Sequence, residues 1–563
     1  MISWDSLERP KRWTAWPLKR KLPLIARLIP PSRNLGYKDF YMDFLAGKNP
    51  PKNFYPAQNP EKVAGEFERV DYNREALVAI LKKQNILYGA GQQTLMEIER
   101  LKDPRAVCVF AGQQAGLLGG PLLTVVKMLG IVKAARRYEK RLQRPVIPVF
   151  WIAGDDHDFE EVNHLFLLDR QSRPCEIAYT ARPETALPAA EIYFSDRGEL
   201  ERVINQIRAC LGDSEYISPL FDLIRRSYTP EDTLVTAFGK FMSALMKDFC
   251  LVLFNPGDQE VKQLAGPFFE NVLNQQSEIQ NLIKVTNEKI LKAGYHLQVE
   301  KKENTTHLFY NKNGRQPVFS YGNDYIHDKN IITRSELLEE LLSFPEKFST
   351  DVLTRPVLQS YLFPTVVQLG GASEIAYFAQ MNPLFGLFDI PAPYQEARPS
   401  VTILEKRFED LMKMHEISFM DVTSDIEQVV NRVLTRSFPE DLEKKMGKLK
   451  NSMKNAFAEF RSTLLIYEPS LDSIAGQSLG KIDFVLKTLE NKVFSSHKKK
   501  SQDIRERMYR LEKAVFPKRG LQERAINITY FIARYGFGVI PYLYEKIDSE
   551  RKEHQIITLS EFV

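Results

Sequence analysis

The sequence of 563 residues predicts an α/β protein with a doubly wound parallel sheet, followed by a helical coiled-coil domain. Three observations lead to this prediction. A strand, a glycine-rich loop, a helix and a second strand follow one another within about fifty residues from Arg105. Two more apolar strands occur later in the chain. From about residue 401 the strand patterns give way to heptads.

The first βαβ unit begins with AVCVFAG, residues 106–112. This run is apolar and rich in small and β-branched residues, which is typical of a strand buried on both faces. The loop GQQAGLLGG, residues 112–120, follows. Pro121 is expected at the first helical position, where its missing N–H costs no hydrogen bond. PVIPVFWIAG, residues 145–154, is the second strand, and this order implies a right-handed crossover between parallel strands.

Further core strands are expected at residues 250–258 and 362–371. Between them, residues 285–350 alternate apolar and polar side chains, and the Asn-Gly pair at 313–314 is a hairpin signal. We therefore expect a small antiparallel subdomain inserted into the doubly wound sheet. Helices are expected at about 73–101 and, after short strands, at about 217–248.

Two heptad seams mark the region after residue 401. The segment EPSLDS separates them, so we expect a helical hairpin that pairs within the chain or with a second copy. The first seam contains Leu442, Met446, Leu449, Met453, Ala456 and Phe460, and the second contains Ile504, Met508, Leu511 and Val515. The expected domains are a basic extension at 1–35, a core at 36–284 and 351–400, the insertion at 285–350, the coiled coil at 401–540 and a tail at 541–563.

Composition excludes several classes of protein. The 26% charged and 44% hydrophobic residues are ordinary globular values, and a net charge of +5 gives no support for nucleic-acid binding. No apolar run reaches the roughly 18 residues that a membrane span needs. Four cysteines without a CxxC pair argue against a disulfide framework or a zinc ribbon and favour a reducing cytoplasm. The eight Lys and Arg among residues 1–33 indicate a solvated extension, with a membrane-surface or transit role as the alternative.

The glycine-rich loop is the first candidate site. It lies between the end of a strand and the start of a helix, where backbone N–H groups and the helix dipole favour an anion. Glycines let a ligand approach the backbone closely, and doubly wound folds bind nucleotides at such loops. The alternative is a tight turn whose glycines serve backbone geometry alone. The candidate residues are Gly112, Gln113, Gln114, Gly116, Gly119 and Gly120.

The second strand ends in an acidic cluster around a histidine, and this cluster is the candidate catalytic site. Packed carboxylates raise one another's pKa values, so the cluster is costly unless it binds something. His157 could act as an acid or a base, or hold a phosphate. The cluster consists of Asp155, Asp156, His157 and Asp158, and Asn163 and His164 close the same motif as candidate substrate-binding residues.

Two other interpretations of this cluster stay open. A metal ion could bind to His157 and His164 together with Asp155 or Asp158, although seven residues along a helix would place the histidines two turns apart. Alternatively, Asp158 could cap a helix whose first turn contains acidic side chains. The capping role is compatible with a catalytic histidine next to it.

Two later segments complete the candidate residues. In QLGGASE, Gly370 and Gly371 could admit a ribose or an adenine, and Glu374 could bind a hydroxyl or an amine. Arg398 could pair with a carboxylate or a phosphate, whereas Tyr377 and Phe378 are expected to pack within their helix. In FPKRGLQER and the residues after it, a second anion or nucleotide site could form, with a solvated basic turn as the alternative. Its candidate residues are Lys518, Arg519, Gly520, Gln522 and Asn527.

These motifs together resemble the BshC family, the cysteine ligases of bacillithiol biosynthesis. The matching segments are FAGQQAGLLGGPLLTVVK, VFWIAGDDHDFEEVNH, QLGGASEIAYFAQ and FPKRGLQER, and the resemblance runs from about residue 36 to the C-terminus. It implies a Rossmann-like core related to class I aminoacyl-tRNA synthetases, with connective-peptide insertions. It also implies a coiled coil that supports a homodimer, and a cytoplasmic enzyme.

The resemblance further implies a reaction. Cysteine would be added to the amine of glucosaminyl-malate as the last step of bacillithiol synthesis, with ATP activating the cysteine carboxylate as an adenylate. The 112–120 loop, the helix at Pro121 and Lys127 would hold the ATP phosphates. His157 or a neighbouring aspartate would accept the amine proton. The segment with Gly370, Gly371 and Glu374 would contact ribose or the sugar, and Arg398 would face the malate carboxylates.

The chain carries neither a HIGH nor a KMSKS sequence, and its cysteines do not stand where they would hold a zinc ion for the substrate thiol. Mg²⁺ is left open as a companion of ATP. Three other functions remain as alternatives: another nucleotidyltransferase on the same fold, a non-catalytic nucleotide-binding scaffold, and a metal-dependent hydrolase using Asp155, His157 and His164.

Overall fold

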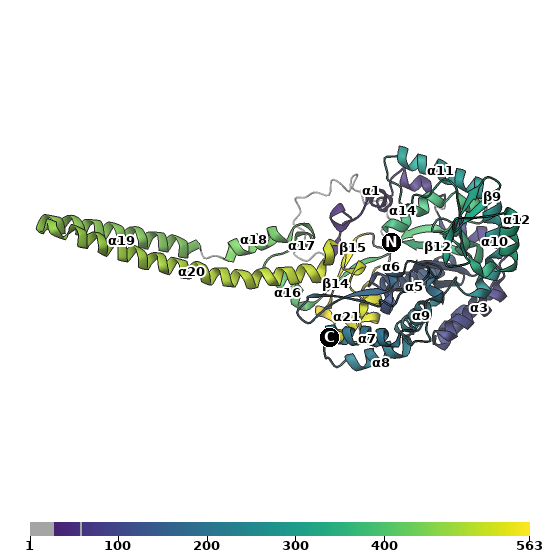
Figure 1. Ribbon diagram of the computed structural model, residues 1–563, viewed down its shortest axis with the longest axis horizontal. Helices are drawn as coiled ribbons and strands as arrows, with labels where there is room; N and C mark the ends of the chain where they lie inside the picture. The colour runs from purple at the N-terminus through teal and green to yellow at the C-terminus, as the bar shows by residue number, and fades with distance from the viewer. Residues whose placement is uncertain (1–26, 57–58, 438–439, 563) are drawn as a thin grey trace, which may run out of the picture. The chain divides into compact units, whose positions relative to one another are not determined.

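The computed structural model describes residues 27–56, 59–437 and 440–562. These residues form two compact units (Figure 1). One contains the described residues up to Lys406 together with those from Pro517 onward, and the other contains Arg407–Phe516. No helix within these residues combines the length and the apolar character that crossing a membrane requires.

A five-stranded parallel sheet forms the centre of the first unit. Its order is β13-β12-β2-β3-β6, with every neighbouring pair parallel. The chain therefore starts in the middle at β2, adds β3 and β6 on one side, and then reverses to add β12 and β13 on the other. This confirms the doubly wound parallel sheet. The strands are β2 (Val107–Gln113), β3 (Val146–Ile152), β6 (Val252–Phe254), β12 (Thr365–Gly370) and β13 (Tyr394–Ala397).

Burial on both faces explains why these strands read as continuous apolar runs. All seven residues of β3 and all six of β12 are buried. Aromatic rings fill the layer between sheet and helices: Phe254 lies 4.9 Å from both Trp151 and Phe363, measured between ring centroids. Aromatic pairs of this kind add about 0.5–1.5 kcal/mol each to the burial itself.

Helices surround this sheet. Those that precede β6 are α1 (Asp39–Leu45), α2 (Pro60–Glu66), α3 (Arg74–Leu87), α4 (Gln92–Glu99), α5 (Leu123–Leu142), α6 (Phe159–Val162), α7 (Arg197–Leu211), α8 (Ile217–Ser227) and α9 (Leu234–Leu245). Those that follow it are α10 (Gln259–Asn274), α11 (Gln276–Lys292), α12 (Arg334–Ser343), α13 (Arg355–Leu362), α14 (Ala372–Met381), α15 (Leu384–Leu387), α21 (Ile528–Tyr535) and α22 (Val539–Lys546). The crossover helix α5 packs against β2 and β3.

Three of the helix predictions need correction. The helix expected at 73–101 is divided into α3 and α4, because Gly89 takes a left-handed conformation after α3. The helix expected at 217–248 is divided into α8 and α9, and Thr233 starts α9 with a capping box. Pro121 is not the first residue of α5, which begins at Leu123; it instead forms a bridge with Asn527.

The inserted segment forms its own five-stranded antiparallel sheet, in the order β10-β9-β8-β7-β11. The expected hairpin turn at 313–314 joins β7 to β8. The strands are β7 (Thr305–Asn311), β8 (Arg315–Tyr321), β9 (Asp324–His327), β10 (Asn330–Ile332) and β11 (Phe348–Thr350).

The C-terminal residues return to the first unit. There β15 (His554–Thr558) lies between β1 (Leu28–Ile29) and β14 (Ser400–Leu404), parallel to β14. Gln522 adds two side-chain hydrogen bonds to the backbone of Ile403. The compact units thus differ from the domain limits expected at residues 401 and 541, because strand pairing with β14 recruits the segment that the sequence presents as a tail.

A two-stranded antiparallel hairpin, β4 (His164–Leu168) and β5 (Pro174–Ala178), completes the strands of the first unit. Cys175 in β5 and Cys210 in α7 form a disulfide across a sequence separation of 35 residues. The cysteine spacing argued against a disulfide framework, and it carried no sign of this single bridge, because only the fold brings the two Cα atoms to 6.6 Å. Cys108 and Cys250 are free thiols.

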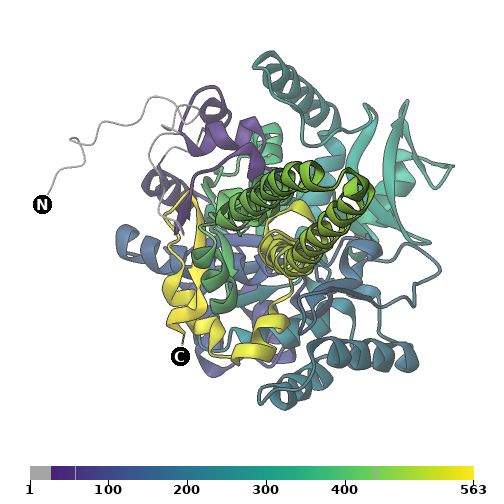
Figure 2. The same ribbon diagram turned by 90° about the vertical axis from the view of Figure 1, so that its left-hand side faces the viewer.

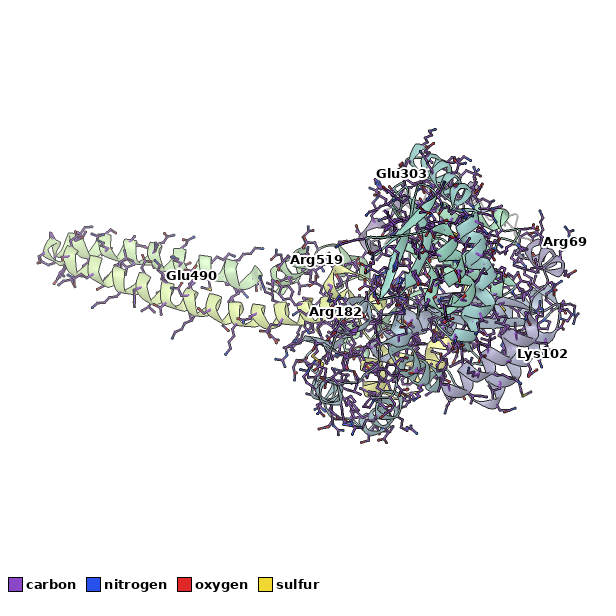
Figure 3. All side chains as sticks on the ribbon, turned by 45° about the vertical axis from the view of Figure 1, so that its right-hand side comes forward. Arg69, Lys102, Arg182, Glu303, Glu490 and Arg519 are labelled. Carbon is purple, nitrogen blue, oxygen red and sulfur yellow. A yellow bond between two sulfur atoms is a disulfide. The ribbon has the colours of Figure 1, made fainter. Side chains whose placement is uncertain are left out.

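The second unit is entirely helical within the residues described. It contains α16 (Lys406–Met414), α17 (Phe419–Ser424), α18 (Ile426–Ser437), α19 (Glu440–Tyr467) and α20 (Asp472–Val515). The last two helices lie side by side as a hairpin (Figures 1 and 2). Lys450 lies 3.8 Å from Glu490 across this hairpin. Figure 3 labels Glu490 on α20. The predicted coiled-coil hairpin is therefore present.

The two heptad seams have different surroundings. Met508, Leu511 and Val515 of the second seam are buried. In the first seam Leu449 and Phe460 remain 46% and 58% exposed, although the hairpin partner covers one side. The hairpin alone therefore leaves a large apolar surface open.

Asn527 offers a test of how the C-terminal segment holds the core. Its amide donates to the carbonyl oxygens of Leu118 and Gly120, and its oxygen caps α21. We expect Asn527→Ala to lower the free energy of unfolding by about 3 kcal/mol, because it leaves buried carbonyls without partners and removes a cap. Urea unfolding measures this loss. The exposed cap variant Asn59→Ala should cost about 1 kcal/mol, and equal losses for the two variants would contradict the role given to Asn527.

Candidate active site

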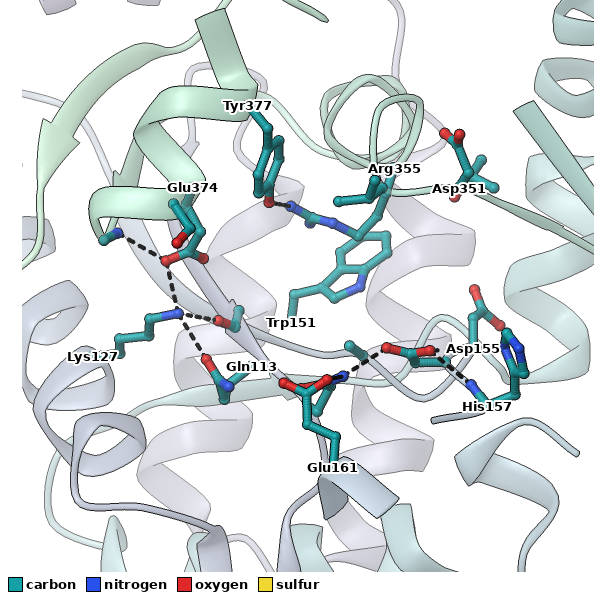
Figure 4. Close-up of a pocket in the computed structure, with 18 of the residues that line it drawn as sticks. Gln113, Lys127, Trp151, Asp155, His157, Glu161, Asp351, Arg355, Glu374 and Tyr377 are labelled. Carbon is teal, nitrogen blue, oxygen red and sulfur yellow. Dashed lines mark hydrogen bonds and ion pairs between the residues drawn. The ribbon is translucent and has the colours of Figure 1, made fainter. Parts of the chain in front are cut away.

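A cavity of about 520 Å³ opens at the carboxyl ends of the central strands (Figure 4). It lies next to the gap between β2 and β12, where the strand order reverses. Doubly wound sheets bind their ligands at such switch points, because the loops on either side diverge there. Cationic and anionic side chains both line it: Lys127, Lys301, Arg315, Arg355, Arg398 and Arg524, and Asp155, Asp156, Glu161, Asp351 and Glu374.

Lys127 is the centre of the hydrogen bonds on the β2–β12 side. Its ammonium lies 2.9 Å from Glu374 Oε2, and it donates to the Gly112 carbonyl at 2.8 Å and to Gln113 Oε1 at 2.9 Å. Glu374 also accepts the N–H of Gly371 at the start of α14. Burial favours the neutral acid, but Lys127 and this N–H outweigh it, and the pKa of Glu374 is lowered. The charge of Lys127 is thus compensated by Glu374, its three donors all have acceptors, and burial lowers its pKa.

The acidic cluster after β3 is spread over different partners. Asp155 Oδ1 lies 2.6 Å from the buried ammonium of Lys262, in α10. Asp156 accepts from Gln114 Nε2 at 2.7 Å, and the same amide reaches Glu161 at 2.7 Å. Both aspartates line the cavity. The like charges are therefore tolerated because each has its own donor.

Asp158 has a local role. Its side chain accepts the N–H of Glu161 as the cap of α6, and it is exposed outside the cavity lining. The capping interpretation is confirmed. Asn163 also lies outside that lining and donates to the carbonyl of Tyr179, while His164 is exposed and contacts the carbonyl of Glu160. These three residues are therefore not brought together with His157 at the cavity.

His157 points into the cavity and contacts the inserted sheet. Its Nδ1 lies 2.8 Å from Nη1 of Arg315, and its ring lies 5.9 Å from that of Phe309. Burial, followed by the charge of Arg315, lowers the pKa of His157. The imidazole is consequently neutral at pH 7.

Arg355 and Tyr377 form the wall opposite this histidine. The guanidinium of Arg355 lies over the ring of Trp151 and donates to the hydroxyl of Tyr377 at 3.2 Å (Figure 4). Tyr377 was expected only to pack within its helix, so the structure adds it to the site. Phe378 is fully packed, as expected.

The glycine-rich loop reaches the cavity only through its first part. Gly112, Gln113 and Gln114 line it, as does Leu123 at the start of α5. The later glycines, Gly116, Gly119 and Gly120, are buried elsewhere. Their geometry serves packing: a Cβ on Gly116 would lie 2.8 Å from the Cα of Gly120, and one on Gly119 would lie 2.6 Å from a sulfur atom. The tight-turn interpretation therefore holds for this second half.

Arg398 lines the cavity, but its charge is already compensated. Its Nη2 lies 2.8 Å from Glu523, which has no exposed surface, and its Nη1 donates to the Pro399 carbonyl. Arg524, the next residue after Glu523, also lines the cavity and is exposed. No hydrogen bond or ion pair of its guanidinium is found among the described residues. Of the two strand-end glycines, Gly371 lines the cavity and Gly370 packs against α14.

The second anion site expected near residue 518 is divided between two environments. Lys518 and Arg519 are exposed, and Lys518 pairs with Glu176. Gln522 and Asn527 are buried in contacts with β14 and the glycine-rich loop. Gly520 belongs to the turn before them. None of the five lines the cavity.

A metal site is not assembled in the described part of the chain: no three His, Cys, Asp or Glu side chains there are grouped to hold an ion. His164 in particular faces the backbone of α6, away from His157.

Besides Tyr377, sequence reasoning missed further residues in and around the cavity, among them four cations. Lys262, Arg315, Arg355 and Arg524 come from α10, β8, α13 and the turn after Leu521. They lie far from the acidic motif in sequence and belong to no spacing pattern. Only Arg315 had an indirect signal, because it directly follows the hairpin turn.

Together, the fold and the cavity define an α/β enzyme of the Rossmann-like class with a coiled-coil domain. The chain belongs to the BshC family. The family description "Bacillithiol biosynthesis BshC, N-terminal Rossmann-like domain" matches residues 29–398, and "C-terminal coiled-coil domain" of the same family matches residues 401–559.

Relatives named "Putative cysteine ligase BshC" cover most of the chain. The protein from Desulforamulus reducens is 30% identical over 90% of this chain and 95% of its own. That from Koribacter versatilis is 29% identical over 92% and 96%, and that from Bacillus cytotoxicus is 28% identical over 86% and 91%.

The buried histidine behind Arg398 leads to a prediction about pH. His554 lies between the hydroxyls of Ser400 and Thr402, and burial lowers its pKa to about 4. A histidine in an unfolded chain has a pKa near 6.5, so the neutral His554 adds to the free energy of unfolding above that pH. This contribution is lost as the pH falls from 6.5 towards 4. The difference between the pKa values of His554 in the unfolded and the folded state corresponds to about 3 kcal/mol in the free energy of unfolding.

Urea unfolding between pH 7 and pH 5 checks this prediction. We expect His554→Gln to be less stable than the wild type at pH 7 but to lose less stability on acidification. The variant His296→Gln, at an exposed position, should keep the wild-type pH dependence. If the free energy of unfolding of His554→Gln fell with pH as steeply as that of the wild type, His554 would not be the group responsible.

Proposed function

We propose that this chain is a cysteine ligase that joins cysteine to the amine of glucosaminyl-malate in the last step of bacillithiol biosynthesis. The names of the relatives and the family support this proposal. The observation that carries it is the cavity at the switch point, which combines cations, carboxylates and a neutral histidine. Amide formation from an acid and an amine needs these groups together, because phosphates or carboxylates must be held beside an attacking amine.

ATP is the activating co-substrate in this proposal. Its phosphates would lie between Gln113, Lys127 and the start of α5 at Leu123. The N-terminal end of the 20-residue helix α5 favours an anion there, and Lys127 holds Gly112 and Gln113 of the β2 loop in place beside it. Mg²⁺ would accompany the nucleotide. The relationship to class I aminoacyl-tRNA synthetases, and with it a cysteinyl-adenylate, belongs to the same proposal.

The acidic groups of the second substrate are better assigned to Arg355 and Arg524 than to Arg398. Arg398 is already paired with Glu523, whereas the partners of the Arg355 guanidinium among the described residues, Gln359 and Tyr377, are uncharged. An incoming carboxylate therefore finds uncompensated guanidinium groups at these two positions. The amine of the substrate would face the carboxylates of Asp155 and Asp156 on the opposite side.

A homodimer through the coiled coil is part of the same proposal. The exposed apolar residues of α19 and α20, among them Leu449 and Phe460, would be covered by the same helices of a second copy. The cytoplasmic location is proposed from the family alone, because the Cys175–Cys210 disulfide removes the cysteine argument for a reducing compartment.

The reaction itself is the first test. The purified chain is incubated with cysteine, glucosaminyl-malate and ATP, and bacillithiol and AMP are measured by mass spectrometry. Both products are expected, and His157→Asn should reduce their formation. AMP without consumption of cysteine would favour a different nucleotidyltransferase. Bacillithiol formed without ATP would remove the adenylate from the proposal.

Arg524 tests where the acidic substrate binds. We expect Arg524→Gln to raise the KM for glucosaminyl-malate by about 10-fold or more, because a charged hydrogen bond contributes about 1.5–3 kcal/mol. The KM for cysteine should change little. Arg69→Gln, at an exposed position outside the cavity lining (Figure 3), serves as the control with unchanged kinetics. An unchanged KM for glucosaminyl-malate in Arg524→Gln would show that Arg524 does not bind the carboxylates of this substrate.

A further inference from the structure

Arg315 directs all three of its guanidinium nitrogens to fixed acceptors. It extends from β8 of the inserted sheet and is 7% exposed. Nε donates to Ser349 Oγ at 2.9 Å, Nη2 to the Thr350 carbonyl at 3.0 Å and Nη1 to His157 Nδ1 at 2.8 Å. The ring of Phe309 lies 3.6 Å from its central carbon. The guanidinium therefore has one orientation.

This contact determines the proton position on His157. A guanidinium has five donors and no acceptor, so the histidine nitrogen that faces it has to carry a lone pair. Nδ1 is that nitrogen, and in a neutral imidazole the proton then resides on Nε2. A doubly protonated ring would place an N–H against the N–H of Arg315.

Some charges around His157 favour protonation of its ring and others oppose it. Asp156 lies 3.8 Å from Nδ1, and Asp158 follows it along the same loop; both favour a charged ring. Arg315 opposes them from the inserted sheet, and burial adds to it. Asp155 is compensated by Lys262 of α10, which also faces Glu191. Burial and Arg315 prevail, so the pKa of the ring is lowered.

We propose that Arg315 is a positioning residue that fixes His157 as the neutral imidazole with its proton on Nε2, so that His157 donates a hydrogen bond to the reacting groups and does not act as the base. This inference rests on the proposed ligase function for its chemical meaning. The inserted sheet thus supplies Arg315, which fixes the proton position on His157 in the loop after β3.

The proton balance of amide formation follows from this assignment. The amine nitrogen forms a bond to the cysteine carbonyl carbon, and the bond from that carbon to its leaving group breaks with its electron pair. The amine also loses a proton. His157 cannot take it, because Nε2 already carries a hydrogen and the Nδ1 lone pair is bound by Arg315. The proton passes to a carboxylate of the cavity, and the Nε2–H stabilises the developing negative charge on oxygen.

Nuclear magnetic resonance of the imidazole nitrogens tests the proposal without any substrate. The protein is labelled with ¹⁵N in its eight histidines, and His157→Gln identifies the signals of His157. We expect a protonated Nε2 and an unprotonated Nδ1 at pH 7, and a neutral ring still at pH 6. A proton on Nδ1, or a charged ring at pH 7, would overturn the proposal.

Substitutions of Arg315 complete the experiment. Arg315→Met should release Nδ1, mix the two tautomers and raise the pKa of His157, whereas Arg315→Lys keeps a charged donor and should retain the Nε2–H form. Arg355→Met removes a cavity arginine that does not contact His157 and should leave the tautomer unchanged. If Arg315→Met does not fold, the wild type and Arg315→Lys still decide the question.

Kinetics separate this inference from the proposed function. With ligase activity established, Arg315→Met should lower kcat and introduce a new pH dependence between pH 5 and 7, and Arg315→Lys should restore part of both. An unchanged pH profile in Arg315→Met would overturn the positioning role. Absence of ligase activity in the wild type would refute the proposed function while leaving the tautomer measurement valid.

Discussion

The buried ion pair between Arg398 and Glu523 joins the two ends of the first compact unit. Arg398 follows the last strand of the central sheet, and Glu523 lies in the segment that returns after the coiled coil. Glu523 also accepts the N–H of Val401 and the hydroxyl of Ser400, so both charges have hydrogen-bond partners. Losing one partner of such a pair costs several kcal/mol, because the other charge remains buried. Arg398 and Arg524, on the two sides of this connection, both line the cavity.

The cavity is assembled from three parts of the chain that have different tasks. The ends of the central strands and the loops after them provide Gln113 and Asp155, and the crossover helix provides Lys127, which is paired with Glu374. The inserted sheet contributes Arg315, which contacts His157 from outside the doubly wound core. The returning C-terminal segment brings Arg524 to the rim. An insertion and a C-terminal segment thus complete the lining of the cavity at the ends of the central strands.

Much of the fold was predictable because it is encoded locally. The strands at residues 107–113 and 146–152 and the glycine turn between the first strand and its helix follow from short runs of residues. The candidate site was predictable where it follows directly on these strands or begins the next helix, as for Asp155, His157 and Glu374. The roles of Gly116, Gly119 and Gly120 were not, because a glycine needed for packing and one needed for a ligand look the same in sequence. The sequence likewise gives no sign that the charge of Arg398 is compensated by Glu523.

By itself the sequence determined the parallel sheet, the helical hairpin, the family and the motif that carries His157, since periodicity and local motifs depend on neighbours along the chain. The tertiary structure alone decided which charges remain uncompensated and which nitrogen of His157 carries its proton. Those properties depend on partners such as Arg315, which lies 158 residues away in sequence. Burial makes these partners decisive, because a buried charge or lone pair takes its state from the groups that replace water around it.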